Sequence, residues 1–571
     1  MVIVIIWSMH TPKPALIILG LLLLAVGGAA AQSGVSFSYT LSMDDPSTHR
    51  IHVVFRCGGL SGPAVDLKMP AWMPGYYQLL DYAGSVEKLR AVDGTGKELG
   101  WEKTSPNTWR VENPAGSRVA GVGGEGAGTG RVAAASAVSG SVITVSYDVL
   151  ATKAFVAQPW LDSTRGYVAP AGVFFYVSGY IHQPVTVEVK PWAGWGGGDQ
   201  APGKGQGQAP GKGQSQAAGK QREPVIATGL EPVAGKKNFY KAQDFDILFD
   251  SPILMGDLEE LKPFTVRGVP HYFTGYKLGE FDRDSLMNEL QKIVRQGVDV
   301  IDDLPYTHYT FLAIGPGRGG IEHLNSTTIG FSGGALSKAQ ERQRTYCFIA
   351  HEYFHHYNVK RIRPIALGPF DYDRENRTDM LWVSEGLTVY YEYMLVRRAG
   401  LMSGQDLLQH FQSDIAAYEN KPGHLYQSLA QSSYETWSDG PFGRTGDSVN
   451  KTISYYQKGP AIGLLLDMAI RHSTGNRKTL DDVMRTVYRV YYKEKKRGFT
   501  DAEFRKTCEN IAGTDLSELF DYVYTVKEPD YAKYLAYGGL GIDSEGKTWK
   551  IYPLQEVDDL QRKIRQDWIR E

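Results

Sequence analysis

The sequence predicts a multidomain protein, in which an all-β domain is followed by an α/β domain and a C-terminal α-helical region. A chain of 571 residues is too long for one hydrophobic core, so two or three domains are expected. Up to about residue 263, short β-type segments alternate with Gly and Pro. From about residue 264, helical patterns with capping residues dominate.

The N-terminus has the layout of a secretory signal peptide. Lys13 precedes an apolar run over residues 16–26, and small residues follow it up to Ala31. A basic residue, a short apolar run and an A-x-A end are typical of a signal peptide cleaved after Ala31. We therefore expect residues 1–31 to be removed, leaving a periplasmic or secreted protein without a stable membrane span. A retained membrane anchor is the alternative, although the run is short for a bilayer.

The predicted β domain covers residues 32–263. Segments such as 51–56, 141–147 and 185–189 alternate in polarity or are rich in β-branched residues. Residues 194–221 break this pattern with a near-repeat rich in Gly, Gln, Lys and Pro, which cannot bury a core. Because strand-like sequence resumes afterwards, we interpret this stretch as a flexible insertion between strands and not as a domain boundary.

The predicted α/β domain covers residues 264–475. A helix is expected over 284–301 and a strand over 309–314. Ser337 and Gln340 form a capping-box pattern, which predicts the start of a further helix.

The helical region is predicted over residues 476–540, followed by a C-terminal tail over 541–571 with a short strand and a charged helix. Thr479 and Thr500 each precede a helical pattern and have an acidic residue three positions later. Each is therefore expected to begin a helix.

Composition excludes some functions. The net charge is −2 with both signs mixed along the chain, so nothing indicates nucleic-acid binding. The three cysteines are too few for a disulfide framework, and we expect buried thiols at Cys57, Cys347 and Cys508.

His351, Glu352 and His355 form an H-E-x-x-H pattern. On a helix, residues four apart lie on the same face, so both imidazoles can bind one metal ion. Glu352 projects beside them and can accept the proton of an attacking water. The alternative is a chance alignment of two structural histidines, since His356 shows that histidines cluster here.

Glu385 is the expected third ligand, because a second, antiparallel helix can bring its carboxylate to the two histidines. Two His and one Glu leave one position of a tetrahedral zinc open for water, as a hydrolytic site requires. We therefore predict one Zn²⁺ per chain. Glu392 lies two turns further along the same face. It either orients a ligand histidine or is a carboxylate that supports the helix.

Several stretches resemble the glycyl aminopeptidase family of zinc peptidases, and they extend over most of the chain after the predicted signal peptide. They are HEYFHHYNVKRIRP (351–364), LWVSEGLTVYYE (381–392), YYQKGPAIGLLLDMAIR (455–471), PAWMPGY (70–76) and TLDDVMR (479–485). The resemblance implies a thermolysin-like catalytic domain. It also implies zinc-dependent removal of N-terminal residues, small ones such as Gly or Ala, from peptide substrates. Family members usually carry a C-terminal PDZ module, for which too little chain follows Leu540, so a recruitment role of that module is not carried over.

The resemblance also implies a site for the substrate's N-terminus. Residues Gly319 to His323 are similar to the G-x-M-E-N motif of related aminopeptidases, although His323 stands where those relatives have Asn. By this likeness Glu322 binds the free α-amine, and the backbone of Gly319 and Gly320 pairs with the peptide as an added strand. The alternative is a Gly-rich turn with a solvated Glu.

Tyr456 resembles the tyrosine that donates a hydrogen bond to the tetrahedral oxyanion in relatives. Tyr455 is its competitor, because only one of two adjacent helical residues can face the metal, and we favour Tyr456. Two other functions remain: a zinc endopeptidase of the same fold, and a non-catalytic protein that binds peptides on a peptidase scaffold. The intact Glu352 argues against the second. The sequence predicts no oligomeric state.

Overall fold

The computed structural model describes residues 34–116, 142–196, 223–443 and 450–570. The predicted signal peptide lies outside these described residues. No helix within them is both long enough and apolar enough to cross a bilayer.

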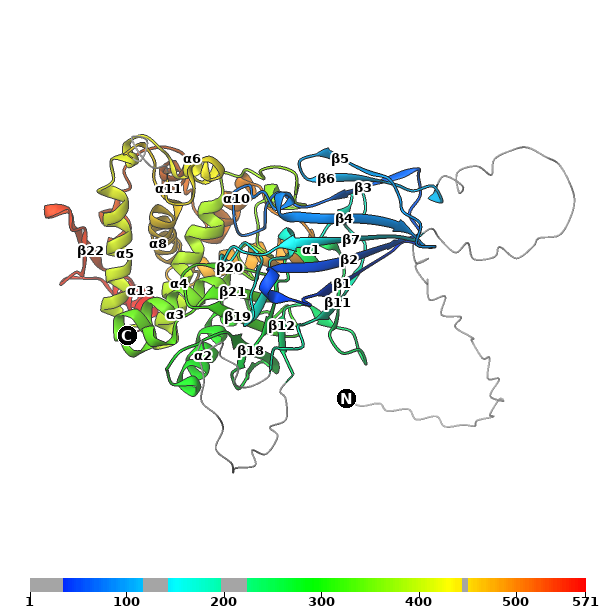
Figure 1. Ribbon diagram of the computed structural model, residues 1–571. Helices are drawn as coiled ribbons and strands as arrows, with labels where there is room; N and C mark the ends of the chain where they lie inside the picture. The colour runs from blue at the N-terminus through cyan, green and yellow to red at the C-terminus, as the bar shows by residue number, and fades with distance from the viewer. Residues whose placement is uncertain (1–33, 117–141, 197–222, 444–449, 571) are drawn as a thin grey trace, which may run out of the picture.

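The N-terminal half is a β domain of three sheets, and Figure 1 shows its strands on one side of the molecule with most helices on the other. In most strands buried and more exposed residues alternate, as expected where one face covers a core. The seven-stranded sheet has the order β13 (Glu231–Pro232), β14 (Phe239–Ala242), β11 (Val185–Lys190), β1 (Ser36–Ser42), β2 (Arg50–Gly58), β7 (Val142–Leu150), β4 (Val86–Asp93).

Two four-stranded sheets complete this domain. Their orders are β10 (Tyr176–Val177), β3 (Ala64–Lys68), β6 (Thr108–Glu112), β5 (Trp101–Ser105), and β12 (Val225–Thr228), β15 (Ile253–Gly256), β9 (Arg165–Val168), β8 (Trp160–Leu161). A short helix, α1 (Phe245–Phe249), ends beside Asp250. One hydrophobic core joins these elements, with Tyr39 stacked on Phe55 at its centre.

The sequence-based prediction that a flexible insertion begins at residue 194 was wrong. Trp195 is fully buried and its indole N–H donates to the carbonyl of Ser163 at 3.1 Å. The Gly196 N–H donates to Asp257. Residues 194–196 thus belong to the packed β domain, because an indole can bury a large apolar area even within a Gly-rich stretch. The remainder of the predicted insertion lies outside the described residues.

The second half begins with a six-stranded sheet. Strands β18 (Val269–Gly275), β19 (Tyr309–Gly315) and β21 (Ser326–Gly330) are parallel, and β20 (Gly320–Glu322) pairs antiparallel with β21 at the edge. β16 (Glu259–Glu260) and β17 (Phe264–Val266) both pair with β18. The helix α2 (Arg283–Ile301) connects β18 to β19, as a parallel connection requires.

Helices form the rest of this half, and their apolar residues share one core with the six-stranded sheet. They are α3 (Ala339–Phe354), α4 (Leu387–Arg398), α5 (Gly404–Glu419), α6 (Leu429–Tyr434), α7 (Thr436–Asp439), α8 (Tyr455–Ser473), α9 (Leu480–Val487), α10 (Asp501–Ala512), α11 (Ser517–Tyr524) and α12 (Tyr531–Ala536), followed by the hairpin β22 (Leu540–Asp543) and β23 (Lys550–Pro553) and by α13 (Asp559–Ile569).

The predicted fold class, an all-β domain followed by an α/β catalytic domain and a helical region, is confirmed. The predicted boundaries after residues 475 and 540 do not separate cores of their own. Trp568 of α13 is fully buried and its indole N–H donates to the Tyr390 hydroxyl of α4 at 3.1 Å. The last residues therefore belong to the core of the catalytic half. The three cysteines are buried free thiols, as expected.

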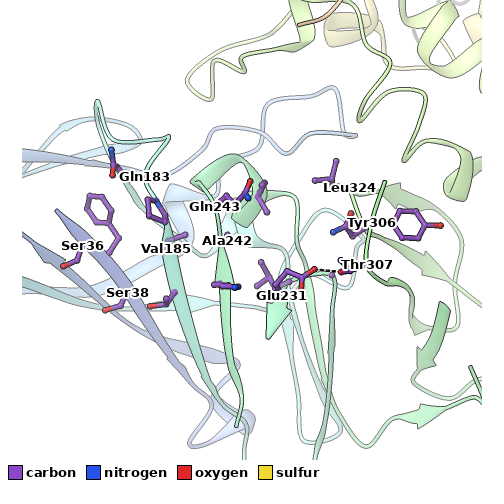
Figure 2. A pocket seen from close by; sticks show the side chains of 18 of the residues that line it. Ser36, Ser38, Gln183, Val185, Glu231, Ala242, Gln243, Tyr306, Thr307 and Leu324 are labelled. Carbon is purple, nitrogen blue, oxygen red and sulfur yellow. Dashed lines mark hydrogen bonds between the residues drawn. The ribbon is translucent and has the colours of Figure 1, made fainter. Parts of the chain in front are cut away.

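A pocket of about 1300 Å³ lies where the two halves meet. Figure 2 shows side chains of β1, β11 and β14 on one side of it, and Tyr306 and Thr307 of the catalytic half on the other. The Thr307 hydroxyl donates to Glu231 at 2.6 Å across the pocket. None of the predicted site residues lines it, so the chemistry expected from the sequence lies elsewhere.

Candidate metal centre

The last turn of α3 presents His351, Glu352 and His355 to the interior. The Nε2 atoms of the two histidines lie 2.9 Å apart. Glu385 Oε2 lies 3.6 Å from His351 Nε2 and 3.2 Å from His355 Nε2. All three side chains are buried, and one ligand atom from each lies within 4.8 Å of the others. The structure therefore brings together the three residues predicted as metal ligands.

The far side of each imidazole is held in place. His355 Nδ1 donates to the carbonyl of Asn358 at 2.7 Å. His351 Nδ1 lies 2.8 Å from Glu392 Oε2. The Nε2 atoms of both histidines face each other and Glu385. Glu392 lies within ion-pair distance of a predicted ligand histidine, and its role in orienting that histidine stays a prediction.

Glu385 lies on a π-helical turn, Trp382–Gly386, that leads into α4. Such turns are rare in proteins. Those that occur are often found at functional sites, because the extra residue changes the direction in which a side chain points. Both carboxylate oxygens accept hydrogen bonds. Tyr77 from the β domain donates to Oε1 at 3.2 Å, and Tyr456 of α8 donates to Oε2 at 2.8 Å.

The donor set fits a zinc ion. Two imidazole nitrogens and one carboxylate oxygen, converging in a buried site, are the ligands of catalytic zinc sites. Burial acts to raise the pKa of Glu385, but His355 and His351 outweigh it and hold the pKa below its usual range. The carboxylate is therefore ionised and available as a ligand.

Glu352 lies beside this group and against the edge strand. One carboxylate oxygen, Oε2, is buried and has no hydrogen-bond partner among the described residues. A Cβ placed on Gly320 would lie 2.4 Å from Glu352 Oε1, so only glycine leaves room for the carboxylate there. Burial raises the pKa of Glu352 to about 7, a range suited to a group that gains and loses a proton near neutral pH.

Glu322 ends β20 and is 3% exposed. Its Oε1 has no hydrogen-bond partner among the described residues, although Lys360 Nζ lies 3.6 Å away. Gly75 of the β domain packs against the same carboxylate, where a Cβ would lie 2.7 Å from Oε2. A solvated Glu in a loose turn, the alternative considered from the sequence, does not describe this buried side chain. Gly319 precedes β20, whose outer edge is not paired within the described sheet.

Behind Glu322, a charged cluster joins the two halves of the protein. Asp250 of the β domain accepts from Lys360 Nζ at 2.9 Å and from the Leu324 N–H at 2.7 Å. His323 Nδ1 lies 3.2 Å from Asp250 Oδ1. His323 therefore contacts Asp250 and is part of this cluster, which gives the histidine at this position a structural role.

Tyr455 and Tyr456 point in different directions, as expected of neighbours at the start of a helix. The Tyr455 hydroxyl bonds the Thr436 hydroxyl at 3.0 Å. Tyr456 reaches Glu385, and its ring centroid lies 6.0 Å from that of His351. Of the two candidates, Tyr456 is therefore the one beside the metal centre.

Three residues at this site were not found from the sequence. Tyr77 directly follows the PAWMPGY stretch, so that stretch was the available signal for it. Lys360 lies within the motif that contains the two histidines, but nothing in its spacing indicates that it contacts Glu322. Asp250 carries no sequence signal, because its role depends on contacts between the two halves.

Two family profiles match this chain. A profile described as M61 glycyl aminopeptidase matches residues 344–462, and one described as the Peptidase M61 N-terminal domain matches residues 38–219. A search of curated proteins found no match.

Solved structures show the same fold. An aminopeptidase N family protein from Idiomarina loihiensis has a TM-score of 0.75 and 23% sequence identity, over 89% of this chain and 79% of that one. An M1 zinc metallopeptidase variant from Deinococcus radiodurans, bound to a Tyr-Ser-Ala substrate, has a TM-score of 0.50 and 11% identity, over 87% of this chain and 96% of that one.

Proposed function

Because the chain belongs to the M61 glycyl aminopeptidase family, we propose that it is a zinc-dependent aminopeptidase that removes N-terminal residues from peptides. We propose Gly or Ala as the preferred first residue, and the word glycyl in the family description supports Gly. We also propose that the protein acts in the periplasm or outside the cell, on the basis of the N-terminal sequence pattern.

The observation that carries the proposal is the buried carboxylate of Glu322 at the end of an edge strand, next to Glu352 and the candidate metal centre. A protonated α-amine placed there gains a charge-assisted hydrogen bond in a site with little water. The free edge of β20 can pair with the backbone of the same peptide. Together these contacts would position the first peptide bond of the substrate beside Glu352.

The chemistry follows from the positions of the side chains. His351, His355 and Glu385 would hold a zinc ion, which would supply Lewis-acid chemistry for the scissile carbonyl and the attacking water. Glu352 accepts the proton of that water and delivers it to the leaving amine. The Tyr456 hydroxyl donates a hydrogen bond to the developing oxyanion.

The test compares free and N-acetylated peptides. A charge-assisted hydrogen bond to Glu322 contributes roughly 1.5 to 3 kcal/mol, so acetylation should lower kcat/KM by about ten- to a hundredfold in the wild type. Glu322→Ala should lose a similar factor on free peptides and change little on acetylated ones. A merely unstable variant would lose activity on both substrates alike, which makes the double comparison its own control.

Two outcomes would replace the proposal. If the wild type cleaves acetylated peptides as fast as free ones, the protein is an endopeptidase of the same fold. If peptides bind but neither kind is cleaved by the zinc-loaded protein, it is a peptide-binding protein on a peptidase scaffold. Substrates with Gly, Ala or Leu at the first position, compared by kcat/KM, test the preference for small residues.

A further inference from the structure

The start of β20 borders a small pocket that contains two arginines. The pocket has a volume of about 80 Å³, and Arg165, Arg318, Phe155 and Gly317 are among the residues that line it. A Cβ on Gly319 would lie 4.0 Å from Val156 Cγ2, so this loop of the β domain lies directly beside the residue that precedes β20. The pocket is therefore at the end of the edge strand opposite to Glu322.

The direction of a bound peptide leads to this pocket. With its amine at Glu322 and its first peptide bond beside Glu352 and Gly320, the peptide runs antiparallel to β20 and continues past Gly319. Arg318 and Glu322 are four positions apart in the sequence, and β20 begins only at Gly320, so their Cα atoms are separated by about 13 Å or less. An extended tripeptide spans roughly 10 Å from its amine to its carboxylate. An arginine side chain covers the remaining distance.

The two arginines retain the capacity to bind an anion. Arg318 is exposed and has no hydrogen-bond or ion-pair partner among the described residues. Arg165 Nε is buried and has no hydrogen-bond partner among the described residues. Its Nη1 makes a long contact of 3.5 Å with Asp162 Oδ2. The guanidinium also lies 4.4 Å from the centroid of the Tyr276 ring, which fixes its orientation.

Asp162 leaves guanidinium donors of Arg165 unused, because other donors already occupy its oxygens. The backbone N–H of Thr164 donates to Oδ1 at 2.8 Å, and the Trp160 indole donates to Oδ2 at 2.9 Å. A planar carboxylate is the ligand that best matches unused guanidinium donors. The pocket of about 80 Å³ has room for several water molecules and is therefore large enough for a carboxylate group.

We propose that this pocket binds a carboxylate of the substrate at the third position of the peptide. The carboxylate is either that of the C-terminus, in which case the enzyme prefers peptides of about three residues, or that of an acidic side chain at the third position. The inference rests on the proposed function, because it takes the position and direction of the peptide from Glu322 and β20.

The experiment measures kcat/KM of the zinc-loaded protein for Ala-Ala-Ala, Ala-Ala-Ala-amide and Ala-Ala-Asp-amide, and for free alanine peptides of two to five residues. Amidation of the tripeptide should lower kcat/KM about ten- to a hundredfold, mainly through KM. In Arg318→Gln the free and amidated tripeptides should be cleaved at similar rates. Arg56→Gln, a change of an exposed arginine on β2, is the matched control and should preserve the preference.

Arg165→Gln provides a second variant, and its melting temperature shows whether it folds. Recovery of the rate by Ala-Ala-Asp-amide would assign the pocket to a side-chain carboxylate, whereas no recovery would assign it to the C-terminus. If the wild type cleaves Ala-Ala-Ala, Ala-Ala-Ala-amide and Ala-Ala-Asp-amide equally well, the inference is overturned and the proposed function is left intact. If the wild type cleaves none of the free peptides, the proposed function itself fails.

Discussion

Glu352 is the residue whose replacement separates metal binding from chemistry. Glu352→Gln keeps the size of the side chain and leaves His351, His355 and Glu385 unchanged, but an amide cannot accept the proton of water. We expect about one zinc per chain and a fall in kcat of at least about 10²- to 10⁴-fold. Metal analysis and kinetics on a free peptide measure both quantities. His351→Ala is the comparison and should lose the zinc. Turnover near that of the wild type in Glu352→Gln would show that another group is the base.

Tyr456 can be tested against its neighbour. Tyr456→Phe removes the hydroxyl that faces the metal centre, so kcat should fall by about 10²- to 10³-fold with a small change in KM. Tyr455→Phe removes a hydroxyl that bonds Thr436 instead, and should retain most of the activity. Zinc content is measured in both variants, because Tyr456 also donates to Glu385. The assignment fails if the two variants lose activity equally.

The two histidines and Glu352 were predicted from local geometry, whereas Glu322 and Tyr456 were predicted from the resemblance to a family. The four-residue spacing of His351 and His355 determines that they share a helix face, whatever surrounds the helix. Tyr77 contacts the same centre from far along the chain, and Asp250 supports it from the other half of the protein. Such contacts depend on how two domains are packed, so no periodicity or spacing in one sequence indicates them.

At the scale of elements, the centre depends on a close crossing of α8 with the π-helical turn that contains Glu385. A Cβ on Gly459 would lie 2.6 Å from the Cα of Gly386. The two backbones therefore approach more closely than any larger residue allows, and this approach positions Tyr456 beside Glu385.

Gly459→Ala should separate these elements. Overpacking of this kind costs about 1–3 kcal/mol, and the displaced Tyr456 should lower kcat as well. Denaturant unfolding and kinetics are the measurements. Gly334→Ala is the control, because a Cβ there meets no atom within 4 Å. If Gly459→Ala has the same stability and kcat as the wild type, α8 can move without affecting the centre.

The first residues of the helices show which local sequence patterns were sufficient to predict where a helix begins. Thr479 and Thr500 cap α9 and α10 with reciprocal capping boxes, as predicted. The capping box predicted at Ser337 was wrong. Ser337 ends a 3₁₀ turn in which its hydroxyl donates to the Gly334 carbonyl, and α3 begins after Lys338 without a side-chain cap. A competing local hydrogen bond engaged the serine, which the pattern of residue types alone does not reveal.

At the scale of the whole molecule, the centre lies where the two hydrophobic cores meet. Trp72 and Tyr77 belong to the β domain in sequence, yet they pack in the core of the catalytic half. Conversely, Leu312 and Ile321, which belong to the six-stranded sheet of the catalytic half, pack in the core of the β domain. Each of the two cores therefore contains side chains from both halves, and a change at their interface should affect both stability and the site.

The buried pair of Asp250 and Lys360 is where this coupling can be measured. Removal of one partner leaves an unpaired buried charge, so Asp250→Ala and Lys360→Met should each lower the free energy of unfolding by about 3–5 kcal/mol. The double variant should lose clearly less free energy of unfolding than the sum of the losses in the two single variants. Glu259→Ala, which breaks the more exposed pair with Arg283, should cost about 1 kcal/mol or less.

The same pair should make stability depend on pH. Burial acts to raise the pKa of Asp250, but Lys360 and His323 outweigh it and lower the pKa. A lowered pKa in the folded state means that the contribution is complete above the unfolded pKa of about 3.9 and is lost as the pH falls below it. The stability difference between wild type and Asp250→Ala should therefore be constant near neutral pH and narrow below about pH 4. Two results would contradict this: a stability difference that does not narrow at low pH, or losses of unfolding free energy in the single variants that simply add in the double variant. The interface would then be held by its apolar contacts, and Glu322 would be positioned without this pair.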